Sequence, residues 1–179
     1  MNPQTEKREL LQSVVEILRQ GESLLGELSD EQYTCKIPAA FNASIGGHYR
    51  HCLDHFCALF QAMVSGQLNY DARERDTPIE TDRFVALQAT RELLANWQNV
   101  NLFSLARPLN VTCKTSYAAA GSQTAASTVA REIMYAVAHA VHHYALINIM
   151  AGSLEIKLTP GFGIAPSTVA HQTTVAVSA

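Results

Sequence analysis

Apolar residues recur every three or four positions in four separate stretches of this chain, which is the spacing of amphipathic helices. The first two stretches are residues 6–27 and Ile45 to about Val64. The third begins at Thr81 and includes Trp97, and the fourth begins after a cap at Ser127 or Thr128 and runs to about Met150. Stretches of roughly 20 residues correspond to helices of about 30 Å. The pattern therefore predicts an all-α fold, a four-helix bundle with two longer cross-connections.

Residues at the ends of these stretches support the predicted bounds. Ser44 is a typical helix cap, and Ser65-Gly66 and Gly152 are typical helix stops. Between the third and fourth stretches, residues 111–117 have the composition of a short strand. We therefore expect one arm of a short β-hairpin before the last helix.

The composition fits one folded domain. Of the 179 residues, 47% are hydrophobic and 16% are charged, which gives enough apolar surface for a single core. We expect this core within residues 1–152. Residues 153–179 form a tail that is richer in small and polar residues, and this tail packs on the bundle or on a partner, or stays partly disordered.

The charge and the cysteine content argue against several classes of protein, namely nucleic-acid-binding, secreted and membrane proteins. The formal net charge is −3 and Lys and Arg do not cluster, so nucleic-acid binding is not expected. A polar N-terminus and a last helix interrupted by histidines predict neither a secretory signal nor a membrane span. The four cysteines form no Cys-x-x-Cys pair and are expected to be reduced thiols. We therefore expect a cytoplasmic protein with no membrane partner.

Six of the seven histidines lie in the second and fourth predicted helices. His139 and His143 are four residues apart, so they lie about 40° apart on one helix face. In the second helix, His48, His51 and His55 fall within about 60° of one another. A single histidine on an apolar face is usually structural, and one or two of these six could face solvent. Burying several imidazoles without partners would be costly, however, which favours a shared ligand.

This arrangement of imidazoles is suited to a metal ion. Two rings one helical turn apart and a third from a facing helix can hold one divalent ion and leave a position open, as catalytic sites do. Neutral imidazole suits zinc, nickel, copper or ferrous iron, so the pattern does not choose the metal. A di-iron centre and a c-type haem do not fit, because Glu-x-x-His and Cys-x-x-Cys-His are both absent. No glycine-flanked serine supports Ser-His-Asp chemistry.

The two histidine segments resemble the DinB/YfiT-like family of metalloenzymes. In the second helix, Ser44-Ile45 precedes His51 by the spacing of the family motif, and Asp54 follows it. In the fourth helix, His139 and His143 match the family's His-x-x-x-His pair. The resemblance covers most of the predicted bundle, although its specific part is these two segments.

The resemblance implies a four-helix bundle that binds one divalent metal ion. The implied ligands are His51, His139 and His143. The resemblance therefore selects His51 among the three histidines of the second helix. Helix geometry alone leaves that selection open. His142 fills the His-His doublet that is common in the family. Members with assigned roles include thiol transferases and isomerases that use small thiol cofactors.

One functional hypothesis is an enzyme, a metal-dependent transferase or hydrolase that acts on a small molecule with or without a small thiol cofactor. The metal would lower the pKa of a bound water or thiol. Candidates for proton transfer are His48, His55, His142 and Tyr135. Asp54 and Glu132 could orient the ligand rings. Arg73 and Arg75 could bind an anionic thiol, although such loop charges are usually solvated.

The other hypothesis is a non-catalytic bundle that uses the metal as a structural staple or sensor, or that mainly assembles with a partner. The fourth helix is also apolar opposite its histidines, at Ile133, Val137 and Val141. A helix buried on both sides in so small a chain predicts cover by the tail or by a second subunit, so a homodimer is expected. The two hypotheses differ in whether the histidines open onto a cleft or are sealed.

Overall fold

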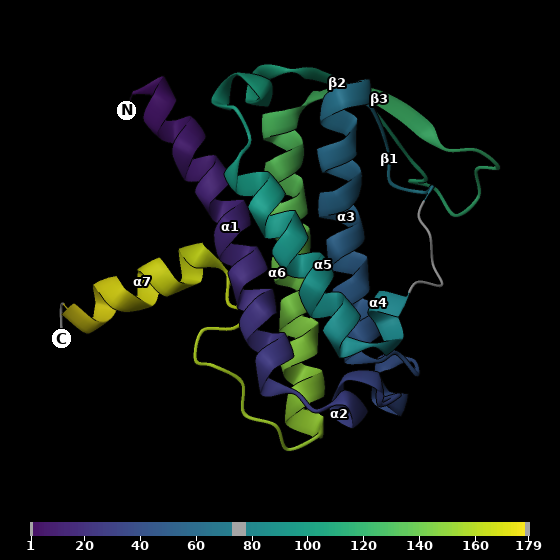
Figure 1. The fold of residues 1–179 in the computed structure, drawn as a ribbon, viewed down its shortest axis with the longest axis vertical. Coiled ribbons are helices and arrows are strands. Elements are labelled where there is room, and N and C mark those ends of the chain that lie inside the picture. The colour runs from purple at the N-terminus through teal and green to yellow at the C-terminus, as the bar shows by residue number, and fades with distance from the viewer. Residues whose placement is uncertain (1, 73–77, 178–179) are drawn as a thin grey trace.

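The computed structural model describes residues 2–72 and 78–177 (Figure 1). In this part of the chain four helices are long: α1 (Pro3–Glu27), α3 (Ile45–Ser65), α5 (Arg83–Gln98) and α6 (Val129–Ser153). Helix α3 packs against α5 and α6, and α1 packs against the same two helices. The predicted, mostly helical fold is confirmed.

Most helix ends lie where local side chains satisfy the free backbone groups. Ser44 begins α3 by accepting a hydrogen bond from the Gly47 N–H, and Gly66 ends it with a φ of 75°. At the start of α6 the cap is Thr128, which accepts from the Arg131 N–H, so the choice left open in the sequence is settled. Helix α6 passes the predicted stop at Gly152 and runs to Ser153.

The predicted start of the third long helix was wrong by two residues. Thr81 ends a separate short helix, α4 (Pro78–Thr81), and α5 begins at Arg83. The cause is Asp82, whose carboxylate accepts hydrogen bonds from the N–H groups of Phe84 and Val85 and so caps a new helix. Tyr33 contacts α4, because its hydroxyl donates a hydrogen bond to the Ile79 carbonyl oxygen at 2.6 Å.

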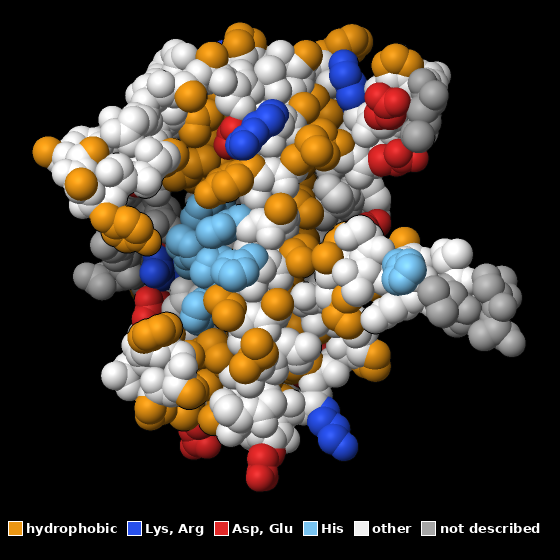
Figure 2. All heavy atoms as spheres, turned by 180° about the vertical axis from the view of Figure 1, so that it is seen from behind, with side chains coloured by type: hydrophobic (Ala, Val, Ile, Leu, Met, Phe, Trp, Pro, Cys, Tyr) orange, Lys and Arg blue, Asp and Glu red, His pale blue; other side chains and the backbone are white. Residues whose placement is uncertain are grey.

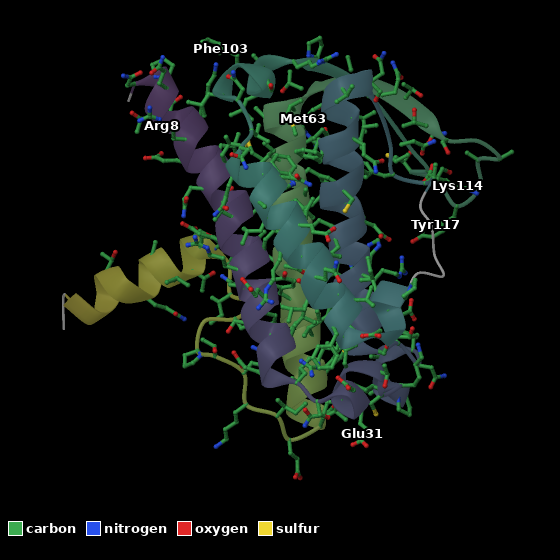
Figure 3. The ribbon with its side chains drawn as sticks, viewed as in Figure 1. Arg8, Glu31, Met63, Phe103, Lys114 and Tyr117 are labelled. Atoms are coloured by element: carbon green, nitrogen blue, oxygen red, sulfur yellow. The ribbon has the colours of Figure 1, made fainter. Side chains whose placement is uncertain are left out.

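The fold is not purely helical, because the described residues include a three-stranded sheet of order β1-β2-β3. Its strands are β1 (Gln67–Asn69), β2 (Pro108–Cys113) and β3 (Gln123–Thr128). β1 pairs parallel with β2, and β2 pairs antiparallel with β3 just before α6. The β-hairpin expected there is present, but its first arm ends at Cys113. Lys114 and Tyr117, which the sequence placed in the strand, lie in the loop between the arms (Figure 3).

Three further short helices connect these elements: α2 (Asp30–Thr34), η1 (Pro38–Ala40) and η2 (Leu102–Ala106). α2 opens with a capping box between Ser29 and Gln32. Among the described residues no helix is long and apolar enough to cross a membrane.

The segment after α6 returns to the body of the protein before a last helix leaves it. Phe162 is buried and its ring stacks on Tyr144 with centroids 4.8 Å apart. Gly163 has a φ of +71° and sits so close to the Tyr144 backbone that a Cβ there would lie 2.6 Å from it. Helix α7 (Pro166–Val177), which the sequence did not predict, then projects away from the other helices (Figure 1).

Candidate metal centre

Helices α3 and α6 bring His51, His139 and His143 together. One nitrogen of each ring lies within 4.8 Å of those of the other two, and all three side chains are half-buried. Helix α6 also carries two small residues, Ala136 and Ala140, which are fully buried. Figure 2 shows the histidines gathered in a hollow on the face opposite to the view of Figure 1.

The three rings meet edge to face around a common point. The ring centroids are 4.9 Å apart for His51 and His139, and 4.6 Å for each of the other two pairs. The Nε2 atoms of His51 and His139 are 2.9 Å apart. Two imidazole nitrogens approach this closely when they share a proton or when both lone pairs face one cation. The donor set is thus chemically suited to zinc, nickel, copper or ferrous iron.

His48 lies directly behind one member of this trio. Its Nδ1 is 2.8 Å from the Nδ1 of His143. This contact leaves Nε2 as the nitrogen of His143 that could bind a metal. In that case the Nδ1–H of His143 donates to the lone pair on Nδ1 of His48, which fixes the orientation of the His143 ring.

His55 lies one turn from His51 and is almost completely buried, with 3% of its surface exposed. Its Nδ1 is 2.9 Å from the carbonyl oxygen of His51. Because a carbonyl can only accept, this nitrogen carries the proton. The ring is 4.2 Å from His139 between centroids and stacks on Tyr70 at 4.9 Å.

Tyr70 connects the imidazoles to a buried carboxylate, a role that the sequence analysis did not predict. Its hydroxyl donates to Glu132 at 2.9 Å, and that carboxylate also accepts hydrogen bonds from Ser127 at 2.6 Å and Arg131 at 2.9 Å. Glu132, expected to orient a ligand ring, is thus linked to His55 through the Tyr70 ring. Tyr70 precedes a polar loop and has no fixed spacing to any histidine, so no motif could have identified it.

The remaining predicted residues surround the trio at different depths. The Tyr135 ring stacks on His139 with centroids 5.7 Å apart. His142 is exposed, and its ring lies 5.3 Å from that of His143. Asp54 accepts a hydrogen bond from Arg50 at 2.6 Å. Arg73 and Arg75, the residues suggested for an anionic thiol, lie outside the described residues.

Two members of the trio, His51 and His143, line a surface pocket with a volume of about 290 Å³. Histidines form one part of its wall, namely His48, His51 and His143. Charged residues form another part: the Glu80 carboxylate is 3.3 Å from Lys36 and 3.1 Å from Arg50. His48, His51 and His143 are therefore accessible from a cleft and are not sealed in the core.

Burial keeps two of these histidines neutral. It lowers the pKa of His143, and the neighbouring imidazoles, His139 first, lower it further to about 3. The pKa of His48 is also lowered, mainly by burial and then by His142. A neutral ring is the form that can offer a lone pair to a metal ion.

The solved structures and known sequences provide independent comparisons. The crystal structure of a DinB-like protein, YjoA from Bacillus subtilis, superposes with a TM-score of 0.60 over 85% of this chain and 96% of the other, at 15% identity. FK506-binding protein 5 of Rhizopus delemar is 33% identical over 104 residues, or 58% of this chain. The chain covers 27% of that relative's length. The family model of the DinB superfamily matches residues 16–147, so this chain belongs to the DinB superfamily.

Proposed function

We propose that this chain is a divalent-metal protein in which His51, His139 and His143 hold one ion within a four-helix bundle of α1, α3, α5 and α6. The observation that carries the proposal is the convergence of three imidazole nitrogens within 4.8 Å, at a place where two of the rings, His51 and His143, line an open pocket. Three protein ligands beside a pocket are typical of catalytic sites, whereas structural sites close every position with protein ligands.

The open pocket favours an enzyme over a structural staple. A bound divalent ion supplies Lewis acidity, which makes a coordinated water or cofactor thiol more acidic and polarises a small substrate. The proposal covers a metal-dependent transferase or hydrolase acting on a small molecule in the cytoplasm. It does not distinguish zinc, nickel and iron, because neutral imidazole suits all three.

The residues around the trio would hold its rings and admit substrate. His48 fixes His143 through the Nδ1 contact, and Tyr135 covers one face of His139 by stacking. Among the proton-transfer candidates, His48 lines the pocket and His142 lies exposed beside it, whereas buried His55 is better placed to support the ligand helix. A proton entering or leaving the pocket would therefore pass through His48 or His142.

A non-catalytic, assembling protein is the second candidate, and one observation supports the assembly part. Helix α6 exposes two large apolar side chains, Met134 at 64% and Ile149 at 71%. Apolar groups on one helix are often covered by a partner. We therefore keep a homodimer as part of the proposal, alongside either role of the metal.

Metal analysis of the purified protein tests the proposal. The wild type, reconstituted with zinc and desalted, should retain about one ion per chain. His139→Ala should lose most of it, because two imidazoles bind a divalent ion much more weakly than three. His142→Ala is the matched control, since it removes an exposed neighbouring imidazole and should keep the metal. Equal metal content in all three proteins would contradict the assignment.

A further inference from the structure

A second pocket lies between α1 and the segment that follows α5, and it shares no lining residue with the histidine pocket. Its volume is about 360 Å³. It is lined by Arg8, Leu11, Gln12, Val15 and Arg19 of α1 and by Trp97, Gln98, Val100 and Leu102. Figure 3 shows the start of this region, where Arg8 on α1 and Phe103 on η2 lie at the same end of the molecule.

The residues of this pocket combine an apolar floor with a cationic rim. Val15 and Trp97 are buried, and three further apolar side chains complete the floor. Arg8 and Arg19 are exposed, and within the described chain neither forms an ion pair. No acidic residue is among the described residues that line the pocket. The rim therefore has two arginines free to bind an anion.

Helix geometry places the two arginines at opposite ends of this pocket. They are eleven residues apart, so they lie about 20° apart on the same face and about 16 Å apart along the axis. Val15 lies on that face between them. A ligand that fits here is elongated, with its apolar part along the floor and its charged group at one arginine.

The floor also contains an unpaired polar group. The indole Nε1–H of Trp97 is buried and has no hydrogen-bond partner within the described chain. Its aromatic neighbour Phe60 packs against it at a tilt of 64° and offers no lone pair. A buried N–H without an acceptor destabilises a fold, so this group calls for an explanation, and an acceptor supplied by a bound molecule is one.

We propose that this pocket binds a small organic anion with an elongated apolar body, such as a medium-chain carboxylate. Apolar surface would contact Leu11, Val15 and Trp97, and the carboxylate would receive charge-assisted hydrogen bonds from Arg8 or Arg19. The volume lies within the range of small-molecule sites, which combine an apolar lining with a few polar groups. This site is separate from the histidine trio and does not depend on metal.

The chain's one tryptophan makes the proposal measurable, because Trp97 reports directly on this pocket. Tryptophan fluorescence would be followed during titration with octanoate and with 1-octanol, which has the same chain length without the charge. Octanoate should saturate the signal and bind about tenfold more tightly than octanol, as expected for a charge-assisted contact. Arg8→Gln with Arg19→Gln should abolish this preference.

Two controls separate the proposal from its alternatives. Lys114→Gln with Lys157→Gln changes the net charge equally at exposed positions elsewhere and should bind octanoate as the wild type does. His139→Ala should also bind it normally, whether or not the trio binds metal. Circular dichroism would verify that each variant is folded. Equal affinity for octanoate and octanol, or an octanoate preference that survives the loss of both arginines, would overturn the proposal.

Discussion

At the scale of single residues, the centre depends on how each imidazole is held. The structure fixes the proton of His55 on Nδ1, through the His51 carbonyl, and pairs His143 with His48 through their Nδ1 atoms. Several half-buried imidazoles cannot all carry charge, so burial and mutual repulsion favour their neutral forms. The pKa values of His143 and His48 are lowered in this way, and a neutral ring is the form that a divalent cation requires.

The His48 contact leads to a prediction about metal affinity. His48→Ala should weaken metal binding about 10- to 100-fold, because the partner that orients a ligand imidazole is typically worth that much. Competition with a chelator of known affinity would measure the change. His142→Ala, which removes an exposed ring close to the same ligand, should change affinity little.

An orienting role for His48 would be contradicted by wild-type affinity in the His48→Ala protein. His48→Gln offers a further check, because its side-chain oxygen can still accept a hydrogen bond from His143. Partial rescue by Gln relative to Ala would support acceptance of that hydrogen bond as the function of the residue.

The sequence predicted that His51, His139 and His143 lie together, as the structure shows, but it did not predict all of their neighbours. Fixed spacing along one helix identified His139 and His143. The family motif selected His51, whereas helix geometry alone left three candidates on one face of the second helix. Tyr70 was missed because its role comes from contacts with His55 and Glu132, which are distant in sequence. Such contacts are set by how α3, α6 and the sheet pack, which no local pattern contains.

At the scale of elements, one end of the pocket is formed by contacts between α3, α4 and the preceding loop. Arg50 of α3 bridges Asp54 of its own helix and Glu80 of α4, and Lys36 also reaches Glu80. Burial opposes ionisation of Glu80, but the hydrogen bonds from Lys36 and Arg50 outweigh this effect, so its pKa is lowered. The ionised carboxylate therefore holds α4 against α3.

Removing this carboxylate should destabilise the fold in a pH-dependent manner. Because the pKa of Glu80 is lower in the folded state, its contribution is complete above the ordinary value of 4.5 and is lost as pH falls through the folded value. Glu80→Gln should lower the free energy of unfolding by about 1 kcal/mol at neutral pH. Urea denaturation of the chelator-treated proteins at several pH values would measure the difference.

The control for this prediction is Glu9→Gln, which neutralises an exposed carboxylate on α1. Its stability should follow that of the wild type at every pH. If the difference between wild type and Glu80→Gln persisted unchanged well below pH 4, ion pairing of Glu80 would not be its source.

Element bounds were predictable where a local signal decides them. Ser44 and Gly66 bound α3 as expected, since a cap and a left-handed glycine act within one turn. The start of α5 was misplaced because Asp82 captures two backbone N–H groups just after Thr81. The strand β1 has three residues, too few to show an alternating pattern, and it is defined by pairing with β2 far along the chain.

At the scale of the whole molecule, the core is large and mostly apolar. Large side chains from several helices are fully buried, including Trp97, Tyr49, Tyr144 and Phe56. The polar ends of two of them are satisfied, since Tyr49 pairs with Thr90 at 2.7 Å and Tyr144 donates to the Ile17 carbonyl at 3.1 Å. A chain of this size can bury enough apolar surface to fold without the ion.

Metal removal should therefore lower the melting temperature and leave the protein folded. A ligand that binds only the folded state stabilises it in proportion to the logarithm of its concentration relative to Kd. Thermal denaturation with and without chelator would show the difference, and circular dichroism at room temperature should remain helical in both samples. Complete unfolding by chelator would show that the ion is part of the fold.

The same thermal shift should disappear in acid. Protons compete with metal for neutral imidazole, so the stabilisation by metal should fall as pH drops through about 6 to 5. The metal-free protein should also lose stability below about pH 6.5, because unfolding allows His143, whose pKa is depressed in the fold, to bind a proton. A metal-dependent shift that is unchanged at pH 5 would require ligands other than histidine.

The most direct test of the account is an anomalous diffraction measurement on crystals of the zinc-loaded protein, collected above and below the zinc absorption edge. The account predicts one anomalous peak, from a zinc ion that is bound by ring nitrogens of His51, His139 and His143. The remaining coordination positions of this ion should face the pocket beside His48. No peak at these rings after metal loading, or a fourth protein ligand that closes the ion off from the pocket, would contradict it.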